Sequence, residues 1–303
     1  MIIDEQVEAR LRGTMSATKW SIVGRDVHVR EVMDQVTRLQ PCLKLLDRYA
    51  VLTVKACGVL ARKSSMIVTW LHANGFDIVD AWTTQITPDR SRTLWRWQLE
   101  KATRQRLWVM DNILGSTETL VLILRDRRDS PVPATTWLSQ NKGPANQDKQ
   151  RTGQLRFVLK PTCYLLNYVH TCDDPVDMLR DIYVLGGMDK VTALCSAVNA
   201  GDSAPRRCDI WNVIAAVESN APVHDLALQS SIAEITQHWP RSDSPHNLEL
   251  LDRIITDEFT GQATESNILV RCSPIDIAVY VAHRFEMSVP NACDPFESVS
   301  GTN

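Results

Sequence analysis

The sequence lacks three features that would place it at once in a common class. No apolar run approaches the ~20 residues that a membrane-spanning helix needs. No two of its eight cysteines form a CxxC pair, which argues against a zinc ribbon and against a secreted domain held by disulfides. The opening residues, MIIDEQVEAR, place acids early and include no apolar segment of a secretory signal. We therefore expect a reduced, cytoplasmic protein that does not enter a membrane.

What the sequence does contain is an uneven distribution of charge. The 303 residues carry a net charge of −3 and are 44% hydrophobic, which is enough apolar material for a core. Residues 49–185 have 18 basic and 13 acidic side chains, whereas residues 186–303 have seven basic and 16 acidic ones. The basic segment suggests a site for anions, and a contact between the two oppositely charged parts explains it equally well. Because the whole chain is acidic, nucleic-acid binding is possible but not favoured.

The hydrophobic pattern divides the chain into three parts. Residues 1–48 are predicted to form an N-terminal helical extension, in which residues 1–25 are loosely ordered and residues 27–48 are helical despite Pro41. Residues 186–303 are predicted to form an acidic, mostly α-helical C-terminal region. Its expected helices cover residues 191–198, 210–217, 226–238, 248–259 and 275–285.

The middle part, residues 49–185, alternates strands and helices. Strands are predicted at residues 50–55, 76–83 and 119–124 and around His170, with a further extended piece at 154–159. Helices are predicted at residues 66–74, 91–113 and 175–183, and a polar loop at 141–152. This order is the split βαβ pattern of a ferredoxin-like antiparallel sheet. The expected fold class is therefore an α+β sandwich followed by a helical region.

This order of elements, together with several local strings, resembles nucleoside diphosphate kinases. The strings are LTVKACG at residues 52–58, WLHANGFDIVD at 70–80 and NYVHTCDD at 167–174. The last is similar to the family's asparagine–x–x–histidine–glycine–serine–aspartate signature, and Asp181 follows His170 by eleven residues, where the family has a glutamate. The resemblance covers less than half of the chain. It implies the family's α/β fold and, as the usual assembly, a homo-oligomer.

The resemblance also implies roles for individual residues. His170 would be the nucleophile that carries a phosphoryl group, and Asp181 the acid that orients its other ring nitrogen. Asn167 and Lys55 would contact the sugar or phosphate region of a nucleotide, and Arg156 would offer a bidentate fork to phosphate oxygens. Two further cations are predicted to bind phosphate, Lys142 in the polar loop and Arg104 in the basic stretch. The implied cofactor is Mg²⁺ brought with a nucleoside triphosphate, and no residue is assigned as a metal ligand.

Around the expected nucleotide helices, arginines alternate with tryptophans. The stretch contains Arg90, Arg92, Arg96, Lys101, Arg104 and Arg106, interleaved with Trp95, Trp97 and Trp108. Such residues can stack on bases and hold phosphates. The simpler interpretation is a solvated basic helix whose tryptophans face the core. We prefer it for the tryptophans, whereas for at least two of the arginines we prefer anion binding.

Several positions depart from the family pattern. Ala56-Cys57 stand where the family has proline and aspartate, Thr171 and Cys172 replace glycine and serine after the histidine, and residues 91–113 contain no tyrosine. Cys172 itself is more simply a small buried residue than a nucleophile. The pocket is therefore remodelled or inactive.

These departures leave three hypotheses open. The first is a nucleoside diphosphate kinase-like phosphotransferase that works through phospho-His170 on a modified or specialised nucleotide. The second is a different reaction on a nucleotide-bearing substrate. The third is a catalytically dead protein that senses nucleotide or anchors an assembly.

Overall fold

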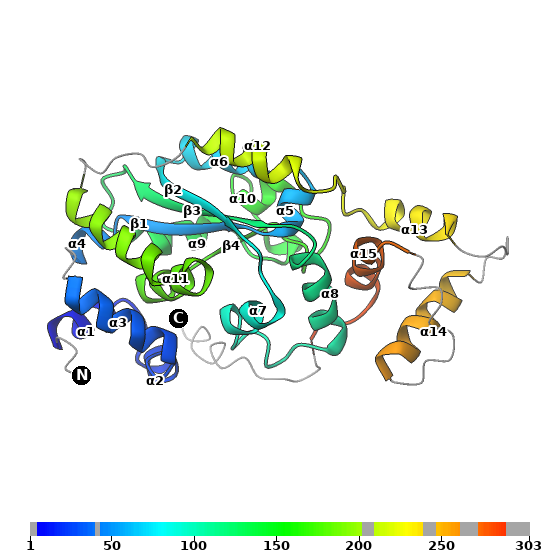
Figure 1. Ribbon diagram of the computed structural model, residues 1–303, viewed down its shortest axis with the longest axis horizontal. Helices are drawn as coiled ribbons and strands as arrows, with labels where there is room; N and C mark the ends of the chain where they lie inside the picture. Colours follow the sequence, from blue (N-terminus) through cyan, green and yellow to red (C-terminus); the bar gives the residue numbers. More distant parts are fainter. Residues whose placement is uncertain (1–4, 40–42, 202–208, 239–246, 261–271, 289–303) are drawn as a thin grey trace.

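The computed structural model describes residues 5–39, 43–201, 209–238, 247–260 and 272–288. Within them, one antiparallel sheet has the strand order β2-β3-β1-β4 (Figure 1). The strands are β1 (Tyr49–Val54), β2 (Phe76–Thr84), β3 (Thr119–Asp126) and β4 (Val169–Thr171). This is the ferredoxin-like order that the sequence predicts, with β1 and β3 in the centre. The prediction of an α+β sandwich with a helical C-terminal region is confirmed.

The prediction of an extended segment at residues 154–159 is wrong. This segment is a short helix, α10 (Leu155–Leu159). Leu155 and Leu159 lie four residues apart and are both fully buried, whereas Phe157 and Val158 between them are exposed. Helical spacing therefore decides which side chains reach the core, and a five-residue segment is too short to reveal that spacing by itself.

The helical stretch expected at residues 91–113 consists of two helices. Helix α7 (Pro88–Leu94) begins after Thr87, and α8 (Arg104–Leu114) begins after Thr103. Each threonine accepts a hydrogen bond from a backbone N–H of the helix that follows it, which is the usual chemistry of a helix start. The other helices of this part are α5 (Ala56–Leu60), α6 (Ser64–Ala73) and α9 (Ala134–Lys142).

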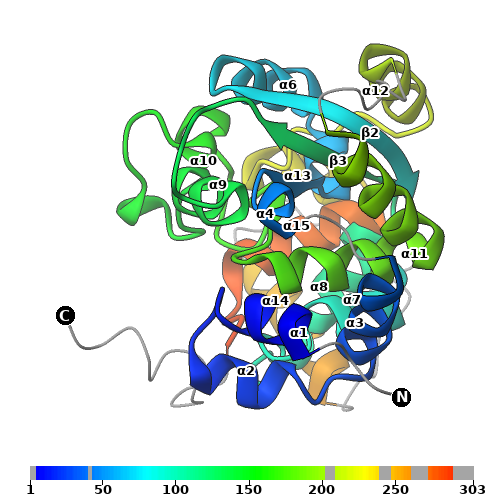
Figure 2. The ribbon, with the colours of Figure 1, turned by 90° about the vertical axis from the view of Figure 1, so that its left-hand side faces the viewer.

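The N-terminal part is more ordered than the sequence suggests. It forms α1 (Glu5–Arg12), α2 (Ala17–Val23), α3 (Val27–Leu39) and α4 (Leu43–Leu46), so the expectation of a loosely ordered start is wrong for the described residues from 5 on. Pro41 lies outside the described residues. Val7, Leu11 and Val23 are buried, and α1 and α3 pack against α11 (Figure 2). A small apolar stripe on each short helix is therefore enough to fix it to the rest of the chain.

The long helix α11 (Pro175–Ala200) runs across the expected boundary between residues 185 and 186. Its first turn carries Pro175, as predicted, and Gly187 interrupts it with φ 75° and ψ 179°. The division of the chain at 48 and 185 stays a prediction. The remaining helices, α12 (Ile210–Ser219), α13 (Leu228–Gln237), α14 (Asn247–Thr260) and α15 (Pro274–Arg284), match the expected C-terminal helices.

The core consists of two apolar clusters, one on each face of the sheet. Because alternate side chains of a strand point to opposite faces, Leu52 and Leu122 belong to one cluster, while Val51 and Val121 belong to the other. The first cluster includes residues of α5, α6 and the C-terminal helices, and α15 packs against α8. The second includes residues of α11 and the N-terminal helices. The N-terminal helices pack against α11, whereas α12 packs against β2, α5 and α6, and α15 packs against α8 to the side of the sheet (Figure 1).

None of the described helices combines the length and the apolar character needed to cross a membrane.

A close backbone contact beside the sheet gives a test of this arrangement. A Cβ atom at Gly58 of α5 would lie 2.9 Å from the backbone oxygen of Tyr168 and 2.9 Å from Cγ1 of Val54. We expect Gly58→Ala to lower the free energy of unfolding by about 1–3 kcal/mol through overpacking, although alanine favours a helix by roughly 1 kcal/mol. Urea unfolding measures it. Gly13→Ala, whose added methyl meets only carbonyl oxygens of α1 at 3.3 and 3.4 Å, is the control, and a Gly58→Ala protein as stable as this control contradicts the close packing.

Candidate functional site: a histidine beside a cationic pocket

His170 is brought to its place by β4 and held there by α11. In the sheet it lies opposite Thr53 of β1. Its Nε2 lies 2.8 Å from Oδ2 of Asp181, which is on the second turn of α11 and 4% exposed. Asp174 caps α11 by accepting the backbone N–H groups of Val176 and Asp177, which fixes where the helix starts. The spacing of eleven residues thus brings the carboxylate back to the imidazole.

The second ring nitrogen of His170 faces Trp95. The indole Nε1 of Trp95 lies 3.4 Å from Nδ1, and the two rings meet edge to face at 83°. An indole N–H can only donate, so Nδ1 accepts and the ring proton sits on Nε2, which donates it to Asp181. At 3.4 Å the bond to Trp95 is long and therefore weak. The lone pair of Nδ1 is thus the one available for chemistry.

Cys172 shares the carboxylate that holds His170. Its Sγ donates to Oδ2 of Asp181 over 3.0 Å. Burial and the neighbouring Asp181 raise the pKa of the Cys172 thiol well above its ordinary value, so the residue stays a thiol. This favours the structural role for Cys172.

The same three side chains also have the composition of a small metal site. The candidate ligand atoms of His170, Cys172 and Asp181 lie within 4.8 Å of one another, the one such group found among the described residues. However, Asp181 already accepts two hydrogen bonds, and its other oxygen lies 3.4 Å from the guanidinium of Arg180. The guanidinium of Arg180 therefore already supplies a positive charge beside Asp181. His170, Cys172 and Asp181 form a hydrogen-bonded cluster.

Beside His170 is a pocket with a volume of about 160 Å³. Three cations line it, Lys55, Arg106 and Arg156, and no carboxylate does. The other polar lining residues are Asn167, Gln98, Tyr164, Cys57, Trp95 and His170 itself, and the rest of the wall is apolar. A pocket with this charge attracts an anion.

Arg156 and Asn167 form one wall of the pocket. The guanidinium of Arg156 donates to the backbone oxygens of Gly143 (2.8 Å) and Val169 (2.9 Å) and to Oδ1 of Asn167 (3.2 Å). Burial lowers the pKa of Arg156 to about 10. The amide of Asn167 in turn donates to the backbone oxygen of Tyr164. The hydrogen bonds of Arg156 and Asn167 hold the pocket wall together, so only some of their donors and acceptors remain for a ligand.

The side chains of Lys55 and Arg106 make fewer hydrogen bonds than that of Arg156. Lys55 follows the end of β1 and is 9% exposed, and its Nζ donates to the backbone oxygen of Leu165 over 3.3 Å. Burial, with help from the nearby Arg156 and Arg106, lowers the pKa of Lys55. Arg106 is 8% exposed, and its buried Nε has no hydrogen-bond partner among the described residues. A buried cation without a partner is costly unless an anion joins it, so we expect an anionic ligand to contact Arg106.

The other two predicted phosphate binders lie elsewhere. Arg104 is exposed and donates to the backbone oxygen of Phe259 on α14. Two residues along a helix correspond to a turn of about 200°, so Arg104 and Arg106 point to opposite sides of α8. Arg106 shares its side with Val109, Met110 and Ile113, a spacing that could have identified it from the sequence. Lys142 ends α9, outside the residues that line the pocket.

The remaining arginines of the basic stretch are already paired. Arg90 bonds to Thr84 and Gln85, and Arg92 to Asp111. Trp97 is buried, and Trp108 packs against the core. The stretch is thus largely structural, apart from Arg106 and Trp95.

Fold and site together define an α+β protein with a histidine beside a cationic pocket. No protein-family model matches the sequence, and no curated protein matches it. Among solved structures, a nucleoside diphosphate kinase from Encephalitozoon cuniculi is 15% identical over 47% of this chain and 90% of that one, with a TM-score of 0.40. A halophilic nucleoside diphosphate kinase from Halobacterium salinarum, solved in complex with CDP, is 17% identical over 47% of this chain and 89% of that one, also with a TM-score of 0.40. The function has to be argued from the contacts of the site.

The unpaired cation predicts where phosphate binds. We expect inorganic phosphate or pyrophosphate to raise the melting temperature of the protein, because a ligand of the folded state stabilises it. Arg106→Met should weaken this binding about 10- to 100-fold, which corresponds to the loss of one charge-assisted hydrogen bond of roughly 1.5–3 kcal/mol. Arg104→Met is the matched control and should keep the shift. Equal loss in both variants would contradict the assignment of Arg106.

Lys142 gives a pH-dependent prediction. Burial and the nearby Arg156 lower its pKa from 10.5 to about 8. Between these two values the unfolded chain binds more protons than the folded one, so the destabilising effect of Lys142 is complete below about pH 8 and disappears by about pH 10.5. We expect Lys142→Met to raise the free energy of unfolding at pH 7 by about 1–3 kcal/mol, since one pKa unit corresponds to about 1.4 kcal/mol. The gain should shrink as the pH rises from 8 to 10.5, measured by urea unfolding. The exposed Lys149→Met is the control, and a gain that does not change with pH contradicts the shift.

Proposed function

We propose that the protein transfers a phosphoryl group through Nδ1 of His170, from a nucleoside triphosphate to a modified or specialised nucleotide. The observation that carries the proposal is the hydrogen bond of 2.8 Å between Nε2 and Asp181, beside a pocket with three cations and no carboxylate. Nδ1 accepts a long, weak hydrogen bond of 3.4 Å from Trp95, which leaves its lone pair accessible, and three cations line the same pocket. Transfer through histidine needs both conditions.

In the proposed step the lone pair of Nδ1 forms a bond to the terminal phosphorus, and the bond from that phosphorus to its bridging oxygen breaks. The electron pair of that bond leaves with the nucleoside diphosphate, whose charge Arg106, Lys55 and Arg156 neutralise. The proton on Nε2 stays in place, and Asp181 stabilises the positive ring that forms. The N–H of Trp95, which now reaches Nδ1, would then donate to a phosphoryl oxygen on it. Transfer to the second nucleotide is the reverse step.

The size of the pocket limits what it encloses. Pockets that bury most of a drug-sized ligand occupy about 300–1,000 Å³, and this one has about 160 Å³. It therefore holds the phosphate end, while sugar and base lie outside it. A pocket that encloses the phosphate end alone is also compatible with the alternative, a different phosphorylated or nucleotide-bearing substrate. The contact between Trp95 and Nδ1 favours the further alternative of a nucleotide sensor without transfer.

The residues that line the pocket include no carboxylate ligand for Mg²⁺. Mg²⁺ prefers carboxylate and other oxygens, yet no carboxylate lines the pocket, and Oδ1 of Asn167 already accepts from Arg156. Mg²⁺ would be held by the phosphates and by water, and we assign it no step. The expected homo-oligomer and the cytoplasmic location stay predictions.

Labelling of the protein tests the proposal. We expect γ-labelled ATP or GTP to leave acid-labile, base-stable label on His170, located by mass spectrometry. His170→Ala should abolish the label, whereas His72→Ala, an exposed histidine on α6, should keep it. Asp181→Asn should slow labelling about 100-fold or more, because the ring proton is no longer held on Nε2.

The alternatives give different results. Nucleotide binding without label supports the sensor or a different reaction. Failure to bind any nucleotide, with phosphate binding retained, favours a small phosphorylated substrate, and label that survives in His170→Ala removes the proposal altogether.

A further inference from the structure

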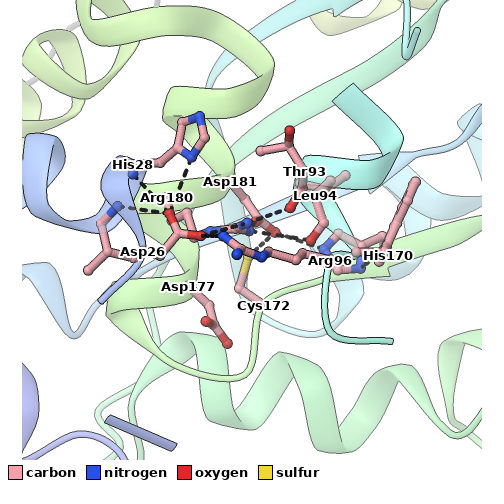
Figure 3. A network of polar contacts seen from close by, with 12 residues as sticks. Asp26, His28, Thr93, Leu94, Arg96, His170, Cys172, Asp177, Arg180 and Asp181 are labelled. Atoms are coloured by element: carbon pink, nitrogen blue, oxygen red, sulfur yellow. Dashed lines mark hydrogen bonds and ion pairs between the residues drawn. The ribbon is translucent and has the colours of Figure 1, made fainter. Parts of the chain in front are cut away.

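Arg180, the residue before Asp181, has its guanidinium buried next to the histidine site. Arg180 is 1% exposed, and its side chain meets groups from three separate elements (Figure 3). Nη1 lies 3.4 Å from Oδ1 of Asp181 and donates to the backbone oxygen of Leu94 over 3.3 Å, and Nη2 donates to the backbone oxygen of Thr93. The guanidinium also lies over the ring of Trp97, 4.8 Å from its centre.

These contacts reach both partners of the His170 ring. Asp181 accepts the proton of Nε2, and Trp95, whose indole N–H meets Nδ1, directly follows the carbonyl groups of Thr93 and Leu94. Arg180 therefore ties the carboxylate on one side of the imidazole to the backbone that carries the indole on the other side. A ring held from both sides has one orientation and one tautomer.

The counter-charge for Arg180 comes from the N-terminal helices. Oδ2 of Asp26, just before α3, lies 3.6 Å from Nη2 of Arg180, and Asp26 is 3% exposed. Its Oδ1 accepts the backbone N–H groups of His28 and Val29, so the same carboxylate also caps α3. Burial by itself would raise the pKa of Asp26, but Arg180 and these two donors lower it below its ordinary value. Asp26 is therefore charged at neutral pH. Its Oδ2 also lies 3.4 Å from Nη1 of the exposed Arg96, so Asp26 shares its charge between the two guanidinium groups, and Asp181 does not balance Arg180 alone.

We propose that Arg180 is a positioning residue for His170, and that Asp26 makes the N-terminal helices part of the histidine site by neutralising Arg180. Without the charge of Asp26, Arg180 draws fully onto Asp181, competes with His170 for the carboxylate and loosens its hold on residues 93 and 94. The importance of this positioning for phosphoryl transfer rests on the proposed function. The positioning itself is a property of the resting protein and can be measured without it.

The test is the tautomer of His170 in the whole chain, followed by NMR with ¹⁵N-labelled imidazole and assigned with His170→Ala. We expect the wild-type ring, when neutral, to carry its proton on Nε2. Asp26→Asn keeps an oxygen that can cap α3 but removes the charge, and it should give a mixture of the two tautomers. Arg180→Met should do the same. Labelling by γ-labelled nucleotide should slow about 10- to 100-fold in both, as when an outer-shell partner of a reacting group is lost.

Lys19→Met is the matched control. Lys19, on α2, pairs with Asp174 and Asp177 on α11, so it fastens the same N-terminal helices to the same helix without touching Arg180. This variant should lower the melting temperature but keep the single tautomer and the labelling rate. The charge-balanced double variant Asp26→Asn with Arg180→Met removes one charge of each sign and serves if Arg180→Met alone does not fold.

The outcomes separate the two proposals. A single Nε2–H tautomer that persists in Asp26→Asn and in the Arg180 variants overturns the inference, and so does equal loss of it in Lys19→Met, which would reduce the role of Asp26 to docking. Loss of the tautomer in the Asp26 and Arg180 variants alone, in a protein that takes no label even as wild type, supports the positioning while the proposed transfer fails.

Discussion

The burial of one guanidinium group is the constraint on which the histidine site depends. A buried cation must be neutralised and its donors must be used, because an unpaired charge in the interior is costly. Arg180 meets most of this requirement: Asp26 before α3 and Asp181 on α11 neutralise its charge, and Nη1 and Nη2 donate to two carbonyl oxygens at the end of α7, while Nε has no hydrogen-bond partner among the described residues. Three segments that are far apart in the sequence have to meet at this point. His170 is held by what they bring together (Figure 3).

The pocket beside the histidine differs from the surroundings of Arg180, because its cations have no counter-charge in the pocket lining. Lys55, Arg106 and Arg156 gather positive charge there, and no lining carboxylate balances it. Arg156 uses backbone oxygens to lower the cost, whereas Nε of Arg106 has no such partner among the described residues. Burial disfavours the charged forms, which is why the pKa values of all three cations lie below their ordinary values. A cluster of cations with lowered pKa values in one pocket is typical of a functional site.

The two terminal parts of the chain contribute to this arrangement. The helices before residue 48 pack against α11, and Asp26 lies just before α3. Among the helices after residue 209, α12 packs against β2, and α15 packs against α8, the helix that carries Arg106. The N-terminal helices thus support the part of the site around His170 through Asp26. The C-terminal helices support α8, which carries Arg106 of the cationic pocket.

The sequence by itself determined the strands, their ferredoxin-like order and the pairing of His170 with Asp181. The strands and their order rest on local periodicity, which a linear pattern contains, whereas the pairing of His170 with Asp181 is what the resemblance to nucleoside diphosphate kinases implies. The sequence assigned Arg104 rather than Arg106, and a strand rather than helix α10, because short or closely spaced patterns do not fix which side of an element faces inward. The link from Asp26 to Arg180 spans more than 150 residues, and no local signal marks it. Only the tertiary structure decided it, since burial is a property of the packed chain, and burial turns two ordinary charged residues into obligatory partners.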